Sequence, residues 1–129
     1  MSAYKKGHIT TFIGKDMYIK GDLHSLGSIF IDGRVEGNIV CQAEVTVSEH
    51  AVVKANITAK YILINGEVQG EVESLEGLKI NSTGKVFGNI RGDRLIIEEG
   101  GVYQGHVNMD VIAAQNIYEN KFEFKPQQA

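Results

Sequence analysis

Cysteine and leucine are scarce in this chain of 129 residues, which has one cysteine and far fewer leucines than isoleucines and valines. The lone Cys41 excludes an intramolecular disulfide and a structural zinc site built from cysteines. We expect it to be a small buried apolar side chain. Isoleucine and valine branch at Cβ, which suits a pleated sheet and costs rotamer freedom in a helix. The composition therefore predicts one all-β domain.

No single sign of charge dominates, because 13 lysine and arginine residues are interspersed with 16 aspartate and glutamate residues, for a net charge of −3. A basic face that would displace counterions from a phosphate backbone is not expected, so the sequence predicts no nucleic-acid partner. Apolar runs are short, and none reaches the roughly 18–20 residues that cross a bilayer. The sequence predicts a cytoplasmic protein.

Internal repetition is the dominant pattern of the chain. A five-residue signature, apolar–x–small–x–apolar, recurs at intervals of 15 to 18 residues, and its central residues are Gly21, Gly37, Ala55, Gly70, Gly88 and Gly105. A second alternating segment, such as residues 29–31 or 62–64, precedes most copies. Turns join the two segments, and three of them contain glycines, Gly33, Gly66 and the pair Gly100-Gly101, which accept positive φ at low cost. Variable turns on a constant strand pattern are typical of a solenoid.

A period near 17 residues is too short for a helix-containing repeat and fits one coil of about three short strands. Coils stacked in parallel about 4.8 Å apart would form a rod of roughly 30 Å. The sequence thus predicts a single-stranded parallel β-helix of about six coils with a continuous hydrophobic core. An antiparallel barrel or sandwich of six hairpins is the alternative. The small central residue either admits bulky neighbours or marks a bend.

Two outward columns of side chains follow from stacking the signature in register. One column is Lys20, Glu36, Lys54, Gln69, Phe87 and Gln104. Its first three members alternate in sign, which should stabilise the stacking by ~0.2–1 kcal/mol per pair. The other column is Asp22, Asn38, Asn56, Glu71, Asn89 and His106. Asparagines stacked on adjacent strands are expected to hydrogen-bond along this second column.

Several short segments carry a resemblance to a known family. They are TFIG at 11–14, IDGRVEGNI at 31–39, GEVQGEV at 66–72, GKVFGNI at 84–90 and LIIEEGGVYQG at 95–105. In order and spacing, the stretch 11–109 resembles the bactofilin domain. The chain departs from the family pattern in two respects, because its single proline, Pro126, leaves no proline-rich flanks and Ala55 replaces a glycine.

The resemblance implies a right-handed β-helix that polymerises without nucleotide into non-polar filaments. Members are bacterial cytoskeletal proteins, often on the inner face of the cytoplasmic membrane, that scaffold cell-shape and cell-wall enzymes. The expected partners are therefore the chain itself, inner-membrane lipid and cell-wall synthesis or hydrolysis enzymes. No enzymatic activity, catalytic residue, metal, nucleotide or other cofactor is expected.

The resemblance also divides the chain into three parts. Residues 11–124 are expected to form the β-helix domain, residues 1–10 a flexible N-terminal tail and residues 125–129 a short disordered C-terminal tail. The N-terminal peptide of the family often attaches the filament to membrane, which suggests weak lipid contacts for Tyr4, Lys5 and Lys6.

The two ends of a β-helix expose unpaired backbone groups and the apolar interior of the last coil, which template further pairing unless capped. Neither terminus of this sequence contains an obvious capping helix. We expect end-to-end polymerisation through Phe12 and Ile13 at one end and Phe122 and Phe124 at the other, because the family commonly places a C-terminal aromatic at this contact.

Two other functional classes are alternatives. Hexapeptide-repeat acyltransferases are also β-helical but need a strict six-residue period, and a monomeric carbohydrate-binding solenoid needs exposed aromatic rows, which only Phe87 and Tyr103 approach. Asp22, Glu36 and Glu71 resemble the carboxylates of polysaccharide-cleaving β-helices. The long loops that wall such grooves are absent from the sequence, as are metal-spaced histidines, a nucleophile elbow and a phosphate loop.

Overall fold

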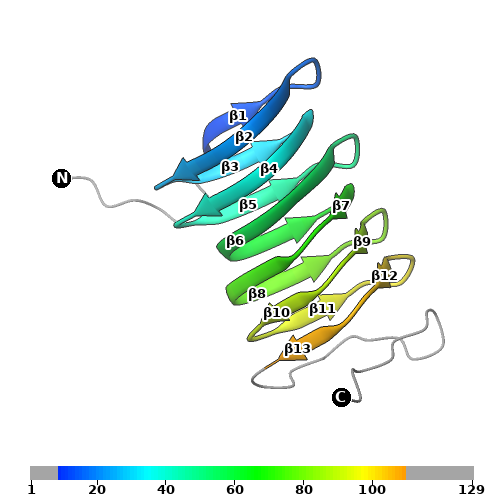
Figure 1. Cartoon of the computed structure of the whole chain (residues 1–129). Helices are drawn as coiled ribbons and strands as arrows, with labels where there is room; N and C mark the ends of the chain where they lie inside the picture. The colour runs from blue at the N-terminus through cyan, green and yellow to red at the C-terminus, as the bar shows by residue number, and fades with distance from the viewer. Residues whose placement is uncertain (1–8, 110–129) are drawn as a thin grey trace.

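The structure, a computed structural model, describes residues 9–109, which form 13 β-strands in one sheet and contain no helix (Figure 1). The strands are β1 (Ile9–Ile13), β2 (Tyr18–Ser25), β3 (Ser28–Ile31), β4 (Arg34–Cys41), β5 (Glu44–Val47), β6 (Val52–Ile64), β7 (Glu67–Gln69), β8 (Val72–Ile80), β9 (Lys85–Phe87), β10 (Ile90–Gly92), β11 (Leu95–Ile97), β12 (Val102–Gln104) and β13 (Val107–Met109). Every strand pair is parallel. The predicted parallel solenoid is confirmed, and the antiparallel alternative is wrong.

The chain winds through six coils stacked one on another. One inward position repeats once per coil and is occupied by Ile13, Ile31, Val47, Ile64, Ile80 and Ile97. Each coil contributes one segment to each of three faces. The first face contains residues 11–13, 29–31, 45–47, 62–64, 78–80 and 95–97; the second contains 18–20, 34–36, 52–54, 67–69, 85–87 and 102–104; the third contains 22–24, 38–40, 56–58, 71–73, 89–91 and 106–108.

Alternation along the strands sends every second side chain into one continuous core. In β6, Val53, Ala55 and Ile57 are buried whereas Lys54 and Asn56 are exposed. Most large core side chains are isoleucine or valine, whose branched Cβ packs well on a pleated surface. The continuous hydrophobic core predicted from the repeat is confirmed.

The small residue of the signature stands at the corner between the second and third faces. Its glycines have φ between 133° and 146°. A Cβ on Gly37 would stand 2.0 Å from the carbonyl oxygen of Gly21 in the coil above. Glycine is needed here for both the bend and the close stacking of coils, so of the two predicted roles the bend is correct. Ala55 is the exception and lies inside the uninterrupted strand β6.

Of the turn glycines, Gly100 has the predicted positive φ, at 99°, whereas Gly33 and Gly66 have a different role. Gly33 and Gly66 are not among the glycines with positive φ, so that expectation is wrong for them. A Cβ on Gly33 would stand 2.4 Å from the carbonyl oxygen of Gly14, and one on Gly66 would stand 2.1 Å from that of Ser48. These glycines let successive turns approach one another.

Strand β1 begins at Ile9, two residues before the predicted start of the domain, and β13 ends at Met109. The predicted end of the domain at residue 124 and the predicted tail 125–129 lie outside the described residues, as does most of the predicted N-terminal tail.

Candidate assembly surfaces

The first coil has one unpaired edge within residues 9–109. Strand β1 pairs only with β3, and β2 pairs only with β4 (Figure 1). The opposite edges of β1 and β2 present backbone N–H and C=O groups to no other described strand. Such an edge is a template for pairing with another chain.

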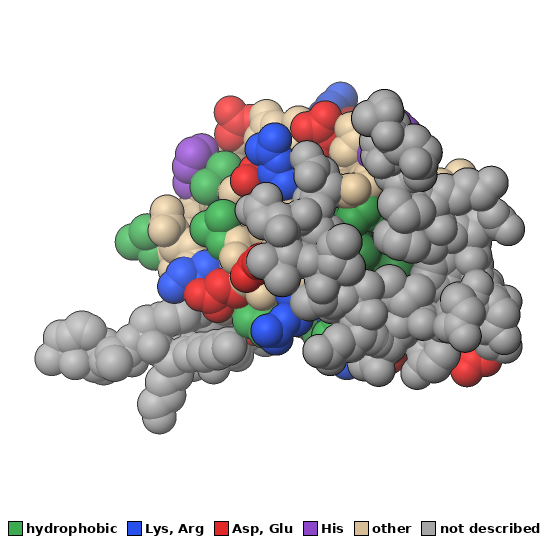
Figure 2. All heavy atoms as spheres, turned by 90° about the horizontal axis from the view of Figure 1, so that it is seen from below, with side chains coloured by type: hydrophobic (Ala, Val, Ile, Leu, Met, Phe, Trp, Pro, Cys, Tyr) green, Lys and Arg blue, Asp and Glu red, His purple; other side chains and the backbone are tan. Residues whose placement is uncertain are grey.

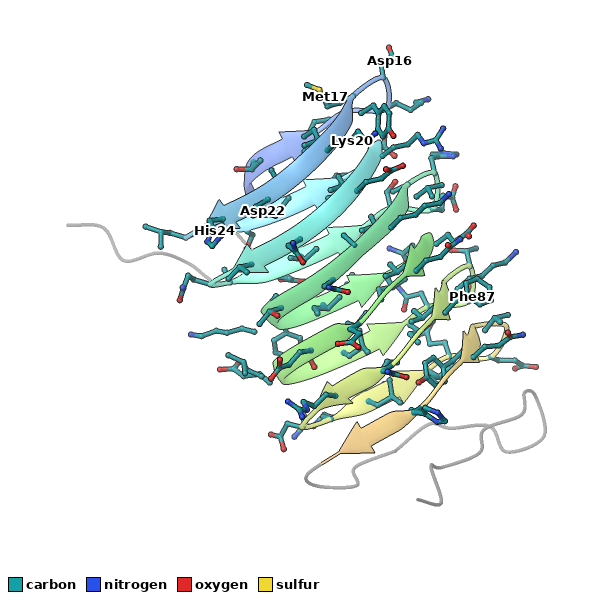
Figure 3. The ribbon with its side chains drawn as sticks, viewed as in Figure 1. Asp16, Met17, Lys20, Asp22, His24 and Phe87 are labelled. Atoms are coloured by element: carbon teal, nitrogen blue, oxygen red, sulfur yellow. The ribbon has the colours of Figure 1, made fainter. Side chains whose placement is uncertain are left out.

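Apolar side chains at this edge are incompletely covered. Ile19 and Leu23 are only partly buried, whereas Val35 and Ile39, which occupy the same positions one coil later, are 0% exposed. Met17 adds an apolar side chain that is 51% exposed and lies with Asp16 at the turn between β1 and β2 (Figure 3). Sequence reasoning missed all three apolar residues. A signal for Ile19 and Leu23 was present, because they are the inward residues of the first signature copy, which has no coil before it.

The residues predicted for this end lie on opposite sides of β1. Ile13 points into the core and is 5% exposed, beside Ile31. Phe12 points outward from the first face, is 63% exposed, and stacks on Phe30 with ring centroids 5.2 Å apart. The other predicted contacts, Phe122, Phe124, Tyr4, Lys5 and Lys6, lie outside the described residues.

The predicted asparagine column forms a hydrogen-bonded ladder on the third face. Asn38 Nδ2 donates to Asp22 Oδ1 at 3.0 Å, and Asn56 Nδ2 donates to Asn38 Oδ1 at 3.3 Å. The backbone N–H of Glu71 donates to Asn56 Oδ1 at 3.0 Å. In each bond the acceptor lies one coil closer to the first coil than the donor, so Asp22, labelled in Figure 3, is the last acceptor. Such chained bonds polarise one another and strengthen the stacking of coils.

The predicted charge column has the expected register but not the expected pairing. Lys20, Glu36 and Lys54 are aligned on adjacent strands, yet no ion pair within 4.0 Å joins them. Glu36 instead accepts a hydrogen bond of 2.9 Å from the hydroxyl of Tyr18. The Tyr18 ring in turn lies 5.9 Å from Lys20 Nζ and 5.5 Å from the Arg34 guanidinium carbon, close enough for cation–π attraction.

Two buried polar side chains are structural. Cys41 is 4% exposed, and burial raises the pKa of its thiol, which keeps it protonated beside the Gly27 carbonyl oxygen at 3.1 Å. Tyr103 is 5% exposed, burial raises the pKa of its phenol, and its hydroxyl donates to the carbonyl oxygens of Gly88, at 3.0 Å, and His106. Tyr103 therefore cannot belong to the exposed aromatic row that a carbohydrate-binding solenoid would need.

Within residues 9–109 the acidic residues considered for catalysis do not come together, and no metal-binding cluster is formed. This part of the chain contains no group of three or more histidine, cysteine, aspartate or glutamate side chains that could hold a metal ion. Asp22 and Glu71 share a column but are three coils apart, and Glu36 lies on another face.

Seen from below, the acidic and basic side chains that are drawn in colour are interspersed with one another (Figure 2). No helix in the described part is long and apolar enough to cross a membrane.

The comparisons with known proteins agree with one another. The family model "Bactofilin: Polymer-forming cytoskeletal" matches residues 11–108. The chain is similar to three bactofilins of Myxococcus xanthus, BacP, BacO and BacN, with identities of 32%, 29% and 40%. The alignments cover 77%, 78% and 79% of this chain. They cover 41% of BacP, 80% of BacO and 90% of BacN, so the chain spans less than half the length of BacP.

A solved structure is also similar. It is the cryo-EM reconstruction of Thermus thermophilus bactofilin double helical filaments, with a TM-score of 0.68 and 28% sequence identity. The superposition covers 76% of this chain and 99% of that chain. The coiled domain described above therefore corresponds to nearly the whole of the subunit in that filament.

Proposed function

Because this chain belongs to the bactofilin family and is a filament-forming cytoskeletal protein rather than an enzyme, we propose that its subunits join end to end through the edges of their outermost coils. The observation that carries the proposal is the unpaired edge of β1 and β2 with the partly covered Ile19 and Leu23 beneath it. A second subunit stacked there completes the sheet and covers the core.

The energy gained in such a contact is of the same size as the cost of association. Covering an apolar side chain of this size contributes ~1.5–3 kcal/mol, and association costs an estimated ~4–15 kcal/mol. A few apolar side chains together with new backbone hydrogen bonds offset that cost. In a non-polar filament the first coil of one subunit meets the first coil of the next, so the contact is self-complementary and β2 pairs antiparallel with its copy.

The Thermus thermophilus relative forms double helical filaments. We extend this to the present chain and propose that two strands of stacked subunits pair side by side. The filament then scaffolds the machinery of cell shape or cell-wall synthesis, bound to the inner face of the cytoplasmic membrane through residues 1–8.

Each lysine near an anionic surface contributes about 1 kcal/mol, so Lys5 and Lys6 bind weakly in one subunit and strongly when a filament presents many copies. Co-sedimentation with anionic liposomes tests this contact. Filaments of the full chain should pellet with the liposomes, and filaments without residues 1–8 should stay in the supernatant. Equal pelleting would rule out the tail as the anchor.

A leucine-to-lysine pair tests the end contact. Leu23→Lys places a charge under the open edge and should leave subunits or short oligomers in negative-stain micrographs. Leu26→Lys is the matched control, because Leu26 is already 82% exposed at a neighbouring corner. This variant should polymerise normally. Circular dichroism confirms that both variants are folded. Long filaments from folded Leu23→Lys would exclude the first-coil edge as an assembly surface.

A further inference from the structure

The outward side of the first face is apolar, unlike those of the other two faces. Its column, which we call the first-face column, is Phe12, Phe30, Thr46, Leu63, Lys79 and Ile96. Four of these six side chains are apolar. The other two faces each have two outward columns of six residues. Their apolar or aromatic members are Tyr18, Val52, Phe87 and Val102 among the twelve of the second face and Val40 alone among the twelve of the third.

This composition breaks the usual pattern of a sheet exposed to water, in which outward positions are polar. Phe30, Leu63 and Ile96 are each partly exposed, and Phe12 is 63% exposed. The stacked rings of Phe12 and Phe30 extend the apolar surface to the first coil. Within residues 9–109 no further strand pairs over this face, because all 13 strands belong to the one wound sheet.

The single charge in the column is compensated within its own subunit. Lys79 Nζ lies 3.3 Å from Glu98 Oε2. Two first faces brought together therefore meet apolar side chains and neutral ion pairs rather than opposed like charges. This arrangement fits a second copy of the same face.

The size of the face points to the same occupant. Six coils about 4.8 Å apart and three residues of about 3.3 Å each give a face of about 300 Å² per subunit. A stable complex buries about 800 Å² on each partner, so this face is far smaller. A single globular partner would bind such a surface weakly. A second strand of stacked subunits repeats the contact at every subunit, so the weak contacts add.

From these observations we propose that the first face is the contact between the two paired strands of the filament, and that its occupant is the first face of a second copy. The proposal rests on the strand pairing stated under the proposed function. End-to-end stacking uses the edges of the coils, and strand pairing uses the first face. Single subunits accordingly do not dimerise, and only assembled strands pair.

A double variant, Leu63→Glu with Ile96→Glu, tests the proposal. Both residues flank Lys79 in the column, so each new carboxylate lies beside a lysine and the subunit should remain folded. We expect filaments of normal length that are single strands, with half the mass per length of the unmodified protein in scanning transmission electron microscopy. The matched control is Val40→Glu with Val102→Glu, which adds the same charge at partly exposed apolar positions of the other two faces and should keep paired strands.

The outcomes separate this inference from the proposed function. Paired strands from the folded Leu63→Glu, Ile96→Glu protein would overturn the inference while leaving the proposed pairing intact. Equal loss of pairing in the control variant would also overturn the inference. Single strands from the unmodified protein would overturn both. Loss of liposome binding with pairing retained would assign the face to lipid and also overturn the inference.

Thiol protection gives a second readout that needs no charged substitution. In Leu63→Cys filaments the new thiol should react with a maleimide at least ten times more slowly than in unassembled subunits. In the control Thr58→Cys, on the third face, the rate should stay unchanged. Cys41 does not interfere, because it is 4% exposed. Equal reaction rates of Leu63→Cys in subunits and filaments would contradict the proposal.

Discussion

The first three coils and the last three use the same five-residue signature but pair it differently. In the first three, β2, β4 and β6 run through the small residue without interruption, and Gly21, Gly37 and Ala55 are aligned in one ladder. In the last three, the strands stop on either side of it, as β7 and β8, β9 and β10, and β12 and β13.

Glycine geometry does not account for this difference. Gly37, inside a continuous strand, has φ of 133°, and Gly88, between two short strands, has φ of 145°. Both would bring a Cβ within 2.0 Å of the preceding coil's carbonyl oxygen. The halves differ in the next residue, because side-chain hydrogen bonds join Asp22, Asn38 and Asn56 in the first half, whereas Asn89 in the second half makes none within residues 9–109. We infer that these amides hold the backbone in register through the corner.

The changeover between the halves is visible at Asn56. Its side-chain oxygen accepts the backbone N–H of Glu71 at the place where the backbone ladder is interrupted. A side chain thus satisfies a donor that the neighbouring strand does not. Beyond it the coils remain joined by backbone bonds on both sides of the corner, such as Gly88 N–H to the Gln104 carbonyl and Ile90 N–H to that of His106.

The largest effect should come from adding one methyl group at the corner. Gly37→Ala forces a side chain into positive φ, at about 1–3 kcal/mol, and into contact with the Gly21 carbonyl, at about 1–3 kcal/mol more. We expect a loss of about 3 kcal/mol or more in the free energy of unfolding. Urea titration in the Leu23→Lys background, where polymerisation does not add to stability, measures it.

Gly88→Ala provides the comparison in the other half. The steric clash is the same, but no side-chain ladder flanks this glycine, so its cost should be about 1 kcal/mol smaller than that of Gly37→Ala. Equal costs for the two variants would show that the ladder does not reinforce the corner.

A smaller effect is expected from cutting the ladder itself. Asn56→Ala removes the bond to Asn38 and leaves the Glu71 N–H without its acceptor, which should cost about 1–2 kcal/mol. Asn89→Ala is the matched control, since Asn89 occupies the same column in the second half without a side-chain hydrogen bond in the described chain, and should change stability by less than about 0.5 kcal/mol. The same urea titration compares the two variants. A larger loss of stability for Asn89→Ala than for Asn56→Ala would show that the amides are not the source of the difference between the halves.

The repeat pattern was sufficient to predict the parallel coils, the inward and outward columns and the asparagine ladder, because each follows from a side-chain period of two and a constant register. It was insufficient for the corner, since a small residue fits either a bend or a packing gap. It also missed Ile19 and Leu23 as assembly residues. Their exposure depends on position in the stack rather than on the local pattern, which is identical in buried Val35 and Ile39.

The smallest effect is expected at Ala55, the one corner without glycine, where the substitution removes a methyl group instead of adding one. Ala55 is buried and its strand is continuous, so it has no need of the conformational freedom of glycine. Ala55→Gly should therefore destabilise the subunit by about 0.5–1 kcal/mol through the greater backbone entropy of the unfolded chain. The glycine corners lose stability on gaining a methyl group, and this corner should lose stability when a methyl group is removed. Stabilisation by Ala55→Gly in the urea titration would mean that the alanine is strained, and that all six corners favour the same bent backbone.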